Sequence, residues 1–276
     1  MLRTLILTLV AALSVLSQAS ANSPSPTAGS SNDATFNYGL SSFLGSGIYS
    51  INGQTVQLYR IPFSADLDNH SADEPHFSVQ LPVTFGFYNF QPQDVLSGQI
   101  PKSLDTLSVL AGIDGNLPLS ETWHYLQLVA VGYTRSAGLV DKKLTGTQIA
   151  LERTAPWNGW VTRYRSEVLG ALSSGGPTGT DRVLRLLQGV EFDRPQSWDI
   201  FRHQAAIGTY GVVRWFPGPF AYTPTHSAIR LETEAGITFG TAEPIRIFRL
   251  PLPRLSLGYR RAADLNVVFL GFGTPF

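Results

Sequence analysis

The sequence predicts an all-β protein: a transmembrane, antiparallel up-and-down β-barrel of about twelve strands, preceded by an N-terminal signal peptide. Three observations lead to this prediction. The chain opens with a segment that has the layout of a secretory signal. The remainder contains long runs in which apolar and polar residues alternate. The last residue, Phe276, is an aromatic that closes one of these runs.

Residues 1–21 are expected to form the signal peptide. Arg3 supplies a positive charge, residues 5–16 form an apolar run, and Ala19–Ala21 offers a small-x-small cleavage site. The run is too short to cross a bilayer as a helix, and no later stretch approaches about 18 consecutive apolar residues. The mature chain is therefore expected to leave the cytoplasm and to contain no membrane-spanning helix.

The composition narrows the class of exported protein. The chain has no cysteine, which excludes a small disulfide-stapled domain. Its net charge is zero, so a nucleic-acid partner is not expected. Charged residues make up 14% of the chain, against about 25% in a typical soluble domain, while aromatic residues reach 11%. These values suit a barrel that faces lipid, although composition alone also allows a soluble secreted β-sandwich.

Two further segments follow the signal peptide. Residues 22–34 are rich in Ser, Pro and Gly and show no apolar periodicity, so a short disordered periplasmic leader is expected there. From residue 35 to residue 276 no linker or change of composition divides the chain. This stretch is predicted to be a single barrel domain.

The clearest strands are residues 76–87 and 231–240. Side chains of a strand alternate between two faces, so every second residue belongs to one set. The first strand has an apolar set consisting of Phe77, Val79, Leu81, Val83, Phe85 and Phe87. The second opposes Leu231, Thr233, Ala235, Ile237 and Phe239 to Glu232, Glu234, Gly236, Thr238 and Gly240. A helix would mix these sets around its circumference, so both segments are predicted to be strands.

The same pattern gives twelve strand candidates. They are residues 36–50, 55–66, 76–90, 105–118, 122–136, 139–153, 157–174, 180–193, 199–216, 227–241, 245–261 and 265–276. An even number returns the chain to its starting side, as single-chain bacterial barrels require. Several candidates are longer than the usual sandwich strand and fit the roughly 9–11 residues that a tilted membrane strand needs. Residues 91–104 are expected to form a surface loop or an inward constriction.

Charged residues on the polar faces of the strands are expected to line the lumen. Facing lipid at mid-depth, an Arg or Lys would cost about 2–4 kcal/mol. The predicted lumen charge network consists of Arg163, Arg165, Glu167, Arg202, Arg214, Glu232, Glu234 and Arg246. The clustered aromatic residues Trp157, Trp160, Trp215 and Phe216 are expected at the headgroup level.

The final segment is expected to carry the signal for insertion into the outer membrane. Counting back in twos, Phe276, Phe272, Leu270 and Val268 share one face of the last strand. A terminal aromatic residue preceded by alternating apolar residues resembles the signal that the barrel-insertion machinery reads. Pro275 departs from the usual pattern because it cannot donate a ladder hydrogen bond.

Residues 36–67 and 81–119 resemble the solitary outer-membrane autotransporter-like β-barrel family. Most of the resemblance is carried by LPVTFGFYNF, the following QPQDVLSGQIPKSLDTLS and the next strand. The resemblance implies a twelve-stranded translocator barrel. It also implies no passenger domain, in agreement with the short leader, and no settled activity.

The expected function is that of a non-enzymatic outer-membrane barrel, with a structural role or a narrow pore. The alternative is a membrane-embedded hydrolase similar to outer-membrane phospholipase A. His76 and Ser78 match the His-x-Ser pair of that enzyme, with Asn89 as the residue that would orient the histidine. His76 and Ser78 lie opposite the apolar face and so point away from lipid. The surrounding motif of that enzyme is also absent.

No cofactor and no metal site is expected, because the histidines lack metal-ligand spacing. The expected location is the outer membrane of a Gram-negative cell after cleavage of the signal peptide. The expected partners are outer-membrane lipids and lipopolysaccharide, the barrel-insertion machinery through the last strand, and periplasmic chaperones.

Overall fold

The computed structural model divides the chain into two units, residues 1–35 and 36–276, and every residue that it describes belongs to the second. Described are residues 43, 46–51, 54–61, 63–67, 74–88, 106–136, 141–175, 180–220, 229–242, 245–247, 250–251, 254–263, 265–272 and 275–276. The predicted signal peptide, the predicted leader and the loop at 91–104 lie outside these residues.

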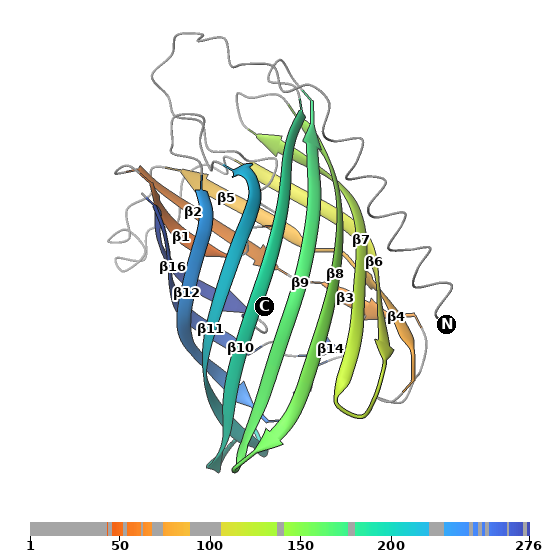
Figure 1. Cartoon of the computed structure of the whole chain (residues 1–276), viewed down its shortest axis with the longest axis vertical. Coiled ribbons are helices and arrows are strands. Elements are labelled where there is room, and N and C mark those ends of the chain that lie inside the picture. The colour runs from red at the N-terminus through yellow and green to blue at the C-terminus, as the bar shows by residue number, and fades with distance from the viewer. Residues whose placement is uncertain are drawn as a thin grey trace. The chain divides into compact units, whose positions relative to one another are not determined.

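The described residues are almost entirely strands (Figure 1). The strands are β1 (Gly47–Ile51), β2 (Gln54–Ile61), β3 (Ser64–Asp66), β4 (His76–Gln80), β5 (Val83–Tyr88), β6 (Thr106–Pro118), β7 (Trp123–Ser136), β8 (Lys142–Trp157), β9 (Trp160–Ser174), β10 (Thr180–Ile200), β11 (His203–Phe220), β12 (Ile229–Thr241), β13 (Arg246–Ile247), β14 (Leu250–Pro251), β15 (Leu255–Ala262) and β16 (Leu265–Phe272). Within the described part of the chain, no helix is both long and apolar enough to cross a bilayer.

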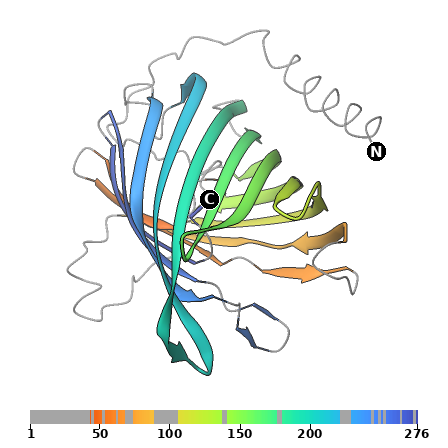
Figure 2. The same ribbon diagram turned by 60° about the horizontal axis from the view of Figure 1, so that its bottom comes forward.

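The strands form one closed antiparallel sheet. Fourteen of the described strands belong to it, and β13 and β14 form a separate hairpin. Because β2 pairs with β5 while β3 pairs with β4, each of the couples β2/β3 and β4/β5 is one interrupted strand, so the described residues form a ring of twelve strands. Each strand pairs with its neighbours along the chain, and β1 pairs with β16. The predicted up-and-down barrel of about twelve strands is confirmed, and Figure 2 shows the curved wall.

The interruption between β4 and β5 lies at Pro82. Proline has no N–H to give to the ladder, although its carbonyl oxygen still accepts a hydrogen bond from the Leu110 N–H at 3.1 Å. The alternation continues across the break, because Val79 and Leu81 are exposed whereas Ser78 and Thr84 are buried. The two pieces therefore keep their apolar residues on one face.

An even number of strands brings the start of β1 and the end of β16 to the same end of the barrel. That end, here called the turn end, also carries the links at 119–122, 158–159 and 201–202. The opposite end, the loop end, carries the links at 89–105 and 221–228. Short turns are typical of the periplasmic side of bacterial barrels.

Two hairpins at the turn end have two-residue turns with positive φ. Asn158 and Gly159 have φ values of 48° and 78°, as expected for the Asn-Gly pair of a type I′ turn. Phe201 and Arg202 form the second turn, with φ values of 49° and 69°. Arg202 is exposed at this tip, so its predicted place in the lumen is wrong. The cause is the length of β10, which continues to Ile200 instead of ending near residue 193.

Other predicted strand bounds also need correction. The candidate at 245–261 becomes a strand of the sheet only from Leu255, and the short β13–β14 hairpin precedes it. The last strand ends at Phe272 and does not reach the C-terminus. In the first candidate, the described residues are strand only from Gly47.

Candidate functional site: the lumen and the lipid-facing wall

Burial along β12 is the reverse of that in a soluble strand. Leu231 and Ile237 are 53% and 51% exposed, whereas Glu232 and Glu234 are 0% and 3% exposed. A soluble protein buries its leucines and leaves most of its glutamates in water. In this strand the apolar face points outward and the carboxylates point into the barrel.

The same reversal holds around the wall. The exposed, outward-facing apolar side chains include Phe77, Val79, Val109, Ile113, Val129, Val131, Leu151, Val168, Val190, Ile207, Val213, Phe239, Leu257 and Val268. Contiguous exposed apolar surface of this extent marks a surface that meets an apolar environment.

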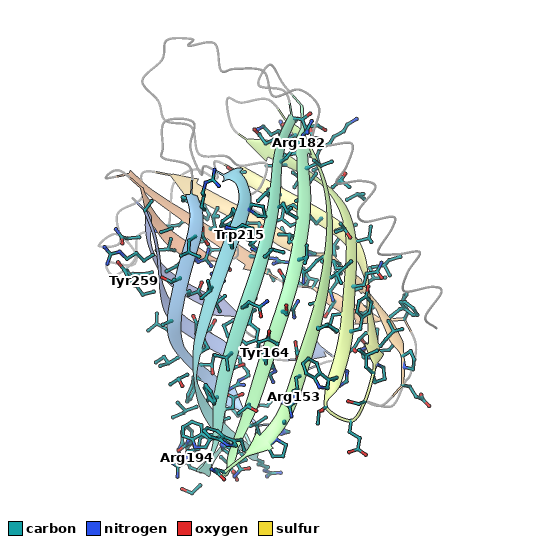
Figure 3. The ribbon with its side chains drawn as sticks, viewed as in Figure 1. Arg153, Tyr164, Arg182, Arg194, Trp215 and Tyr259 are labelled. Atoms are coloured by element: carbon teal, nitrogen blue, oxygen red, sulfur yellow. The ribbon has the colours of Figure 1, made fainter. Side chains whose placement is uncertain are left out.

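Aromatic side chains lie toward both ends of this apolar band. Near the turn end, the Arg153 guanidinium lies 5.8 Å from the centre of the Trp123 ring, and Tyr164 packs edge-on against the same ring. Toward the loop end, Trp215 and Tyr259 face outward and are exposed, as Figure 3 shows together with Arg153 and Tyr164. Amphipathic rings at these two levels suit the headgroup regions of a bilayer.

A closed sheet with an apolar exterior, aromatic belts and a polar interior pairs its strands with one another without water from outside. The chain folds as an outer-membrane β-barrel. The soluble sandwich does not hold, because its apolar faces would be packed against each other and buried. Among the expected belt residues, Trp157 and Trp215 are exposed, but Phe216 is 2% exposed and points inward, so its place in a belt was wrong.

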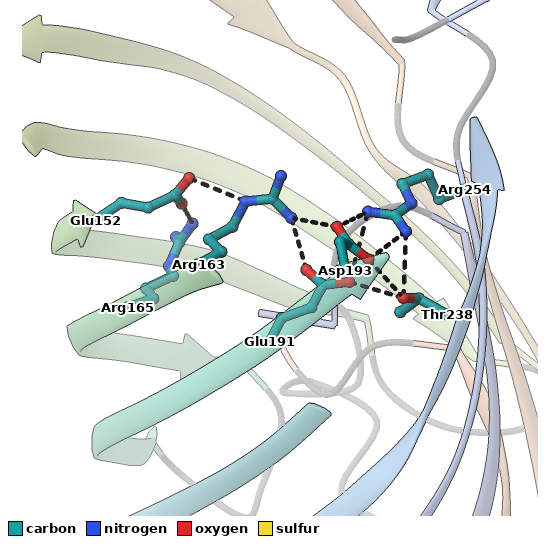
Figure 4. A network of polar contacts seen from close by, with 7 residues as sticks. All are labelled: Glu152, Arg163, Arg165, Glu191, Asp193, Thr238 and Arg254. Carbon is teal, nitrogen blue, oxygen red and sulfur yellow. Dashed lines mark hydrogen bonds and ion pairs between the residues drawn. The ribbon is translucent and has the colours of Figure 1, made fainter. Parts of the chain in front are cut away.

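The lumen contains a chain of ion pairs that crosses from β8 to β10 (Figure 4). Arg163 donates to the Glu191 carboxylate at 2.6 Å and lies 3.5 Å from Glu152. Arg165 reaches Glu152 at 3.4 Å and Glu167 at 3.0 Å. Each arginine therefore joins two carboxylates, and neighbouring strands are cross-linked through their side chains.

The chain of ion pairs continues to the segment that precedes β15. Arg254 contacts both carboxylate oxygens of Asp193, one of them at 2.5 Å. The Thr238 hydroxyl donates to Glu191 at 2.8 Å. Gly208 lies between Asp193 and Thr238 in register, and a Cβ atom there would collide with both side chains. Glycine at this position lets groups of β10 and β12 meet above β11.

A second cluster is centred on Glu234 of β12. One of its oxygens accepts hydrogen bonds from Arg214 and Arg260, both at 2.8 Å, and the other accepts one from the Tyr210 hydroxyl at 3.0 Å. The Tyr210 ring lies over Gly258, where any Cβ would overlap it. All four polar residues of the cluster are buried, so two arginines share one carboxylate as their counter-ion in a site that water barely reaches.

The structure brings together most of the predicted lumen residues. Arg163, Arg165, Glu167, Arg214, Glu232 and Glu234 all face inward. Arg202 does not, as described above, and the side chain of Arg246 lies outside the described residues. The prediction omitted Glu152, Arg185, Glu191, Asp193 and Arg254. The alternation along β10 already placed Arg185, Glu191 and Asp193 on the same face as Gly189, and this pattern would have identified them.

The predicted His-x-Ser pair lies on β4 and faces the lumen. The Ser78 hydroxyl donates a hydrogen bond to the Asp114 carboxylate and accepts one from the Gln80 amide at 3.3 Å. A ring nitrogen of His76 lies 3.3 Å from the Glu74 carbonyl oxygen. Asn89 lies outside the described residues. Ser78 thus directs its proton toward a carboxylate. Within the described part of the chain, no cluster of His, Asp and Glu is arranged to hold a metal.

The predicted insertion signal is only partly as expected. Val268 faces outward and is exposed. The side chains of Leu270 and Phe272 lie outside the described residues. Phe276 packs against inward-facing residues of β10 and β11, so the prediction that it shares a face with Val268 is wrong. The reason is that β16 ends at Phe272 and Pro275 cannot continue the ladder.

The other end of the barrel chain also places an aromatic ring inside. Phe43, which precedes β1, packs against Leu110, Ala130 and Leu144 on the inner wall. The Phe43 carbonyl oxygen accepts a hydrogen bond from Arg185 at 3.2 Å. Residues before β1 and after β16 therefore both contribute to filling the lumen.

No protein-family model matches this sequence, and no curated protein matches it. Among solved structures, the β-domain of the Bordetella autotransporter BrkA is 14% identical, with a TM-score of 0.48, over 82% of this chain and 92% of that one. The translocator domain of the autotransporter NalP from Neisseria meningitidis is 12% identical, with a TM-score of 0.45, over 83% of this chain and 85% of that one. These structural neighbours are autotransporter β-domains, the kind of barrel that the sequence resembles.

Proposed function

We propose that this chain is a non-enzymatic outer-membrane barrel with a structural role, whose lumen is at most a narrow pore of mixed charge. The observation that carries the proposal is the balance of the buried charges. Among the described residues, arginines and carboxylates face each other in the same interior: Arg163, Arg165, Arg185, Arg214, Arg254 and Arg260 with Glu152, Glu167, Glu191, Asp193, Glu232 and Glu234. Arg60 and Asp114 add one inward-facing charge of each sign, and Lys142 pairs with Asp181.

Pairing of this kind favours a filled lumen over an open one. A wide channel leaves its lining charges in water, whereas Glu191, Glu232 and Glu234 are at most 3% exposed. The lumen of a barrel grows with its number of strands, and twelve strands are far fewer than the 16–18 of open porins. The balanced signs also favour weak selectivity between cations and anions.

Planar-bilayer recording on the refolded protein tests this proposal. The wild type is expected to show small or no conductance steps and little ion selectivity. Arg163→Ala removes the group that joins Glu152 to Glu191, so conductance is expected to rise several-fold with a preference for cations. Arg194→Ala is the matched control, because this arginine lies on the outer face above Trp160 and should change nothing. Large, porin-like steps from the wild type would contradict the proposal.

The proposal that the chain is not a hydrolase rests on the hydrogen bond that the Ser78 hydroxyl donates to Asp114. A serine nucleophile needs a base that accepts its proton in reach of substrate. Here Ser78 is 5% exposed and faces the inside of the barrel, and its hydroxyl is bound to Asp114. Phospholipid vesicles with a fluorescent acyl chain are expected to release no fatty acid with the wild type or with Ser78→Ala. Hydrolysis that is lost in Ser78→Ala would overturn this part of the proposal.

We also propose that the chain contacts phosphorylated lipids of the outer leaflet, including lipopolysaccharide. The support is a set of exposed basic residues at the loop end of β7, β8, β10 and β15: Arg135, Lys143, Arg182 and Arg261. The double variant Arg135→Ala/Lys143→Ala is expected to lower the phosphate of lipopolysaccharide that co-purifies with the barrel. Arg153→Ala, at the turn end, is the control and should leave that phosphate unchanged.

Export is proposed to proceed by cleavage after Ala21, with later help from periplasmic chaperones and the barrel-insertion machinery. N-terminal sequencing of the protein from the outer-membrane fraction is expected to begin at Asn22. A mature protein that still begins at Met1 would refute cleavage. The same fraction, run on gels with and without boiling, should show the change in mobility of a folded barrel.

A further inference from the structure

The inner wall contains a small apolar island among its charged residues. It consists of Leu187 on β10 and Tyr210 and Val212 on β11, all at most 5% exposed. In register, Leu187 faces Arg214, and Val212 faces Glu234 on its other side. Uncovered apolar side chains in a polar lumen would be in contact with water, so this island needs a partner.

The partner is the last residue of the chain. The Phe276 ring packs against the island and lies directly over Gly189. A Cβ atom at position 189 would be 2.6, 2.8 and 2.9 Å from three carbons of the ring. Any residue larger than glycine would therefore displace the ring. The surface at Gly189 on which the ring lies is called the seat below.

Phe276 reaches this seat by leaving the wall. The strand that ends at Phe272 and the strand that carries Gly189 are separated in the sheet by β15, β12 and β11. The Phe276 ring thus lies inside the barrel against β10 and β11, away from the neighbours of β16 in the sheet. Pro275 is buried in the same segment, and its missing N–H prevents further pairing with β15.

We infer that the island around Gly189 is a binding site for a phenylalanine ring, and that Phe276, which follows β16, occupies it as a built-in stopper of the lumen. The inference rests on the proposed function, a barrel with a filled interior. It adds that part of the filling is removable, because Phe276 lies beyond the end of β16 and does not belong to a strand of the wall. The site recognises an aromatic ring.

The test compares conductance of refolded variants in planar bilayers. Gly189→Ala keeps Phe276 in the sequence but places a methyl group where its ring lies. The conductance is expected to rise several-fold over that of the wild type. Gly211→Ala is the matched control, because the nearest atom to a Cβ there is 4.0 Å away, and its conductance should equal that of the wild type. Removal of Pro275 and Phe276 is expected to have the same effect as Gly189→Ala. Addition of the peptide Gly-Thr-Pro-Phe to the truncated chain should restore the low conductance.

Each outcome has a definite meaning. Gels with and without boiling first establish that every variant is a folded barrel, and Gly189→Ala retains the terminal residue if the truncated chain does not insert. If folded Gly189→Ala and the truncated chain both conduct like the wild type, Phe276 is not a stopper. The proposal of a lumen filled by ion pairs is then unaffected. If the wild type itself conducts like an open porin, the proposed function fails and the stopper fails with it. A peptide without the final phenylalanine should have no effect, and closure by that peptide would refute recognition of the ring.

Discussion

On the inner wall, the arc from β9 to β15 carries buried charges, whereas the arc from β2 to β7 carries buried hydroxyl and amide groups. In the first, the charged arc, the described buried residues include Glu167, Glu191, Asp193, Arg214, Glu232, Glu234 and Arg260. In the second, the hydroxyl arc, the described and fully buried polar residues are Gln57, Ser78, Thr84, Thr106, Ser108 and Thr134, while the inward-facing charged residues Arg60 and Asp114 are only partly buried. Both arcs are equally hidden from water, but they tolerate the loss of a partner very differently.

The difference follows from what remains when a contact is broken. A buried arginine without its carboxylate keeps its full charge in a medium that solvates it poorly. A hydroxyl without its partner loses one weak bond and can turn toward another acceptor. The charged arc should therefore be the sensitive side of the barrel and the hydroxyl arc the tolerant side.

The largest effect is expected for Glu234→Gln. This change leaves Arg214 and Arg260 buried without their shared counter-ion, and the free energy of unfolding should fall by about 3–5 kcal/mol. Urea unfolding in detergent micelles, followed by gel mobility, measures it. Glu152→Gln, whose side chain is 21% exposed, should lose about 1 kcal/mol or less. Equal losses in the two variants would remove the distinction between deep and shallow pairs.

A second variant places a charge on the other face of the same strand. Ile237→Arg puts an arginine on the lipid side of β12, where the cost at mid-depth is about 2–4 kcal/mol. Folding into lipid vesicles should be impaired far more than folding into micelles, whose surface adapts to a charge. Equal impairment in vesicles and micelles would show that this face does not meet the bilayer core.

Gly208→Ala should have an intermediate effect on the charged arc. The added methyl group collides with Asp193 and Thr238 and must push them apart, at a cost of about 1–3 kcal/mol. The midpoint of thermal unfolding, again read from gel mobility, should fall accordingly. Gly211→Ala, on the neighbouring outward face, provides the comparison and should keep the wild-type midpoint.

The smallest effect is expected in the hydroxyl arc. Ser108 and Thr134 share a hydrogen bond of 2.7 Å, and Ser108→Ala should cost about 1 kcal/mol. The double variant Ser108→Ala/Thr134→Val should cost little more, because both polar partners are then gone. A loss of unfolding free energy as large as that of Glu234→Gln would contradict the expected difference in tolerance between the two arcs.

The sequence was sufficient for the barrel because the membrane imposes a pattern with period two. The alternation at 231–240 and at 76–87 places each residue inside or outside without knowledge of its neighbours, and the structure confirms both assignments. Arg163, Arg165 and Glu167 could be placed on the inner face for the same reason. Their partners could not be identified, because pairing across strands depends on register, which no local pattern sets.

The errors arise where the chain leaves the sheet. Arg202 fits the alternation in sequence, yet it lies in a turn because β10 is longer than the pattern showed. Phe276 also fits it, yet β16 ends four residues earlier. Counting in twos holds only while the strand continues, and the ends of strands are set by contacts that lie far away in the sequence.

The pairing of β1 with β16 has a consequence for how the molecule comes into being. All other neighbouring strands of the ring follow one another in the chain. At this seam, the first and the last strand are joined by four residue pairs, from Ile48 and Val268 to Ile51 and Leu265. Hairpins can zip up as soon as their two strands exist, whereas closing a loop of this length carries the largest entropic cost of the assembly. We therefore expect the seam to close last, after the hairpins have formed an open ribbon with two unpaired edges.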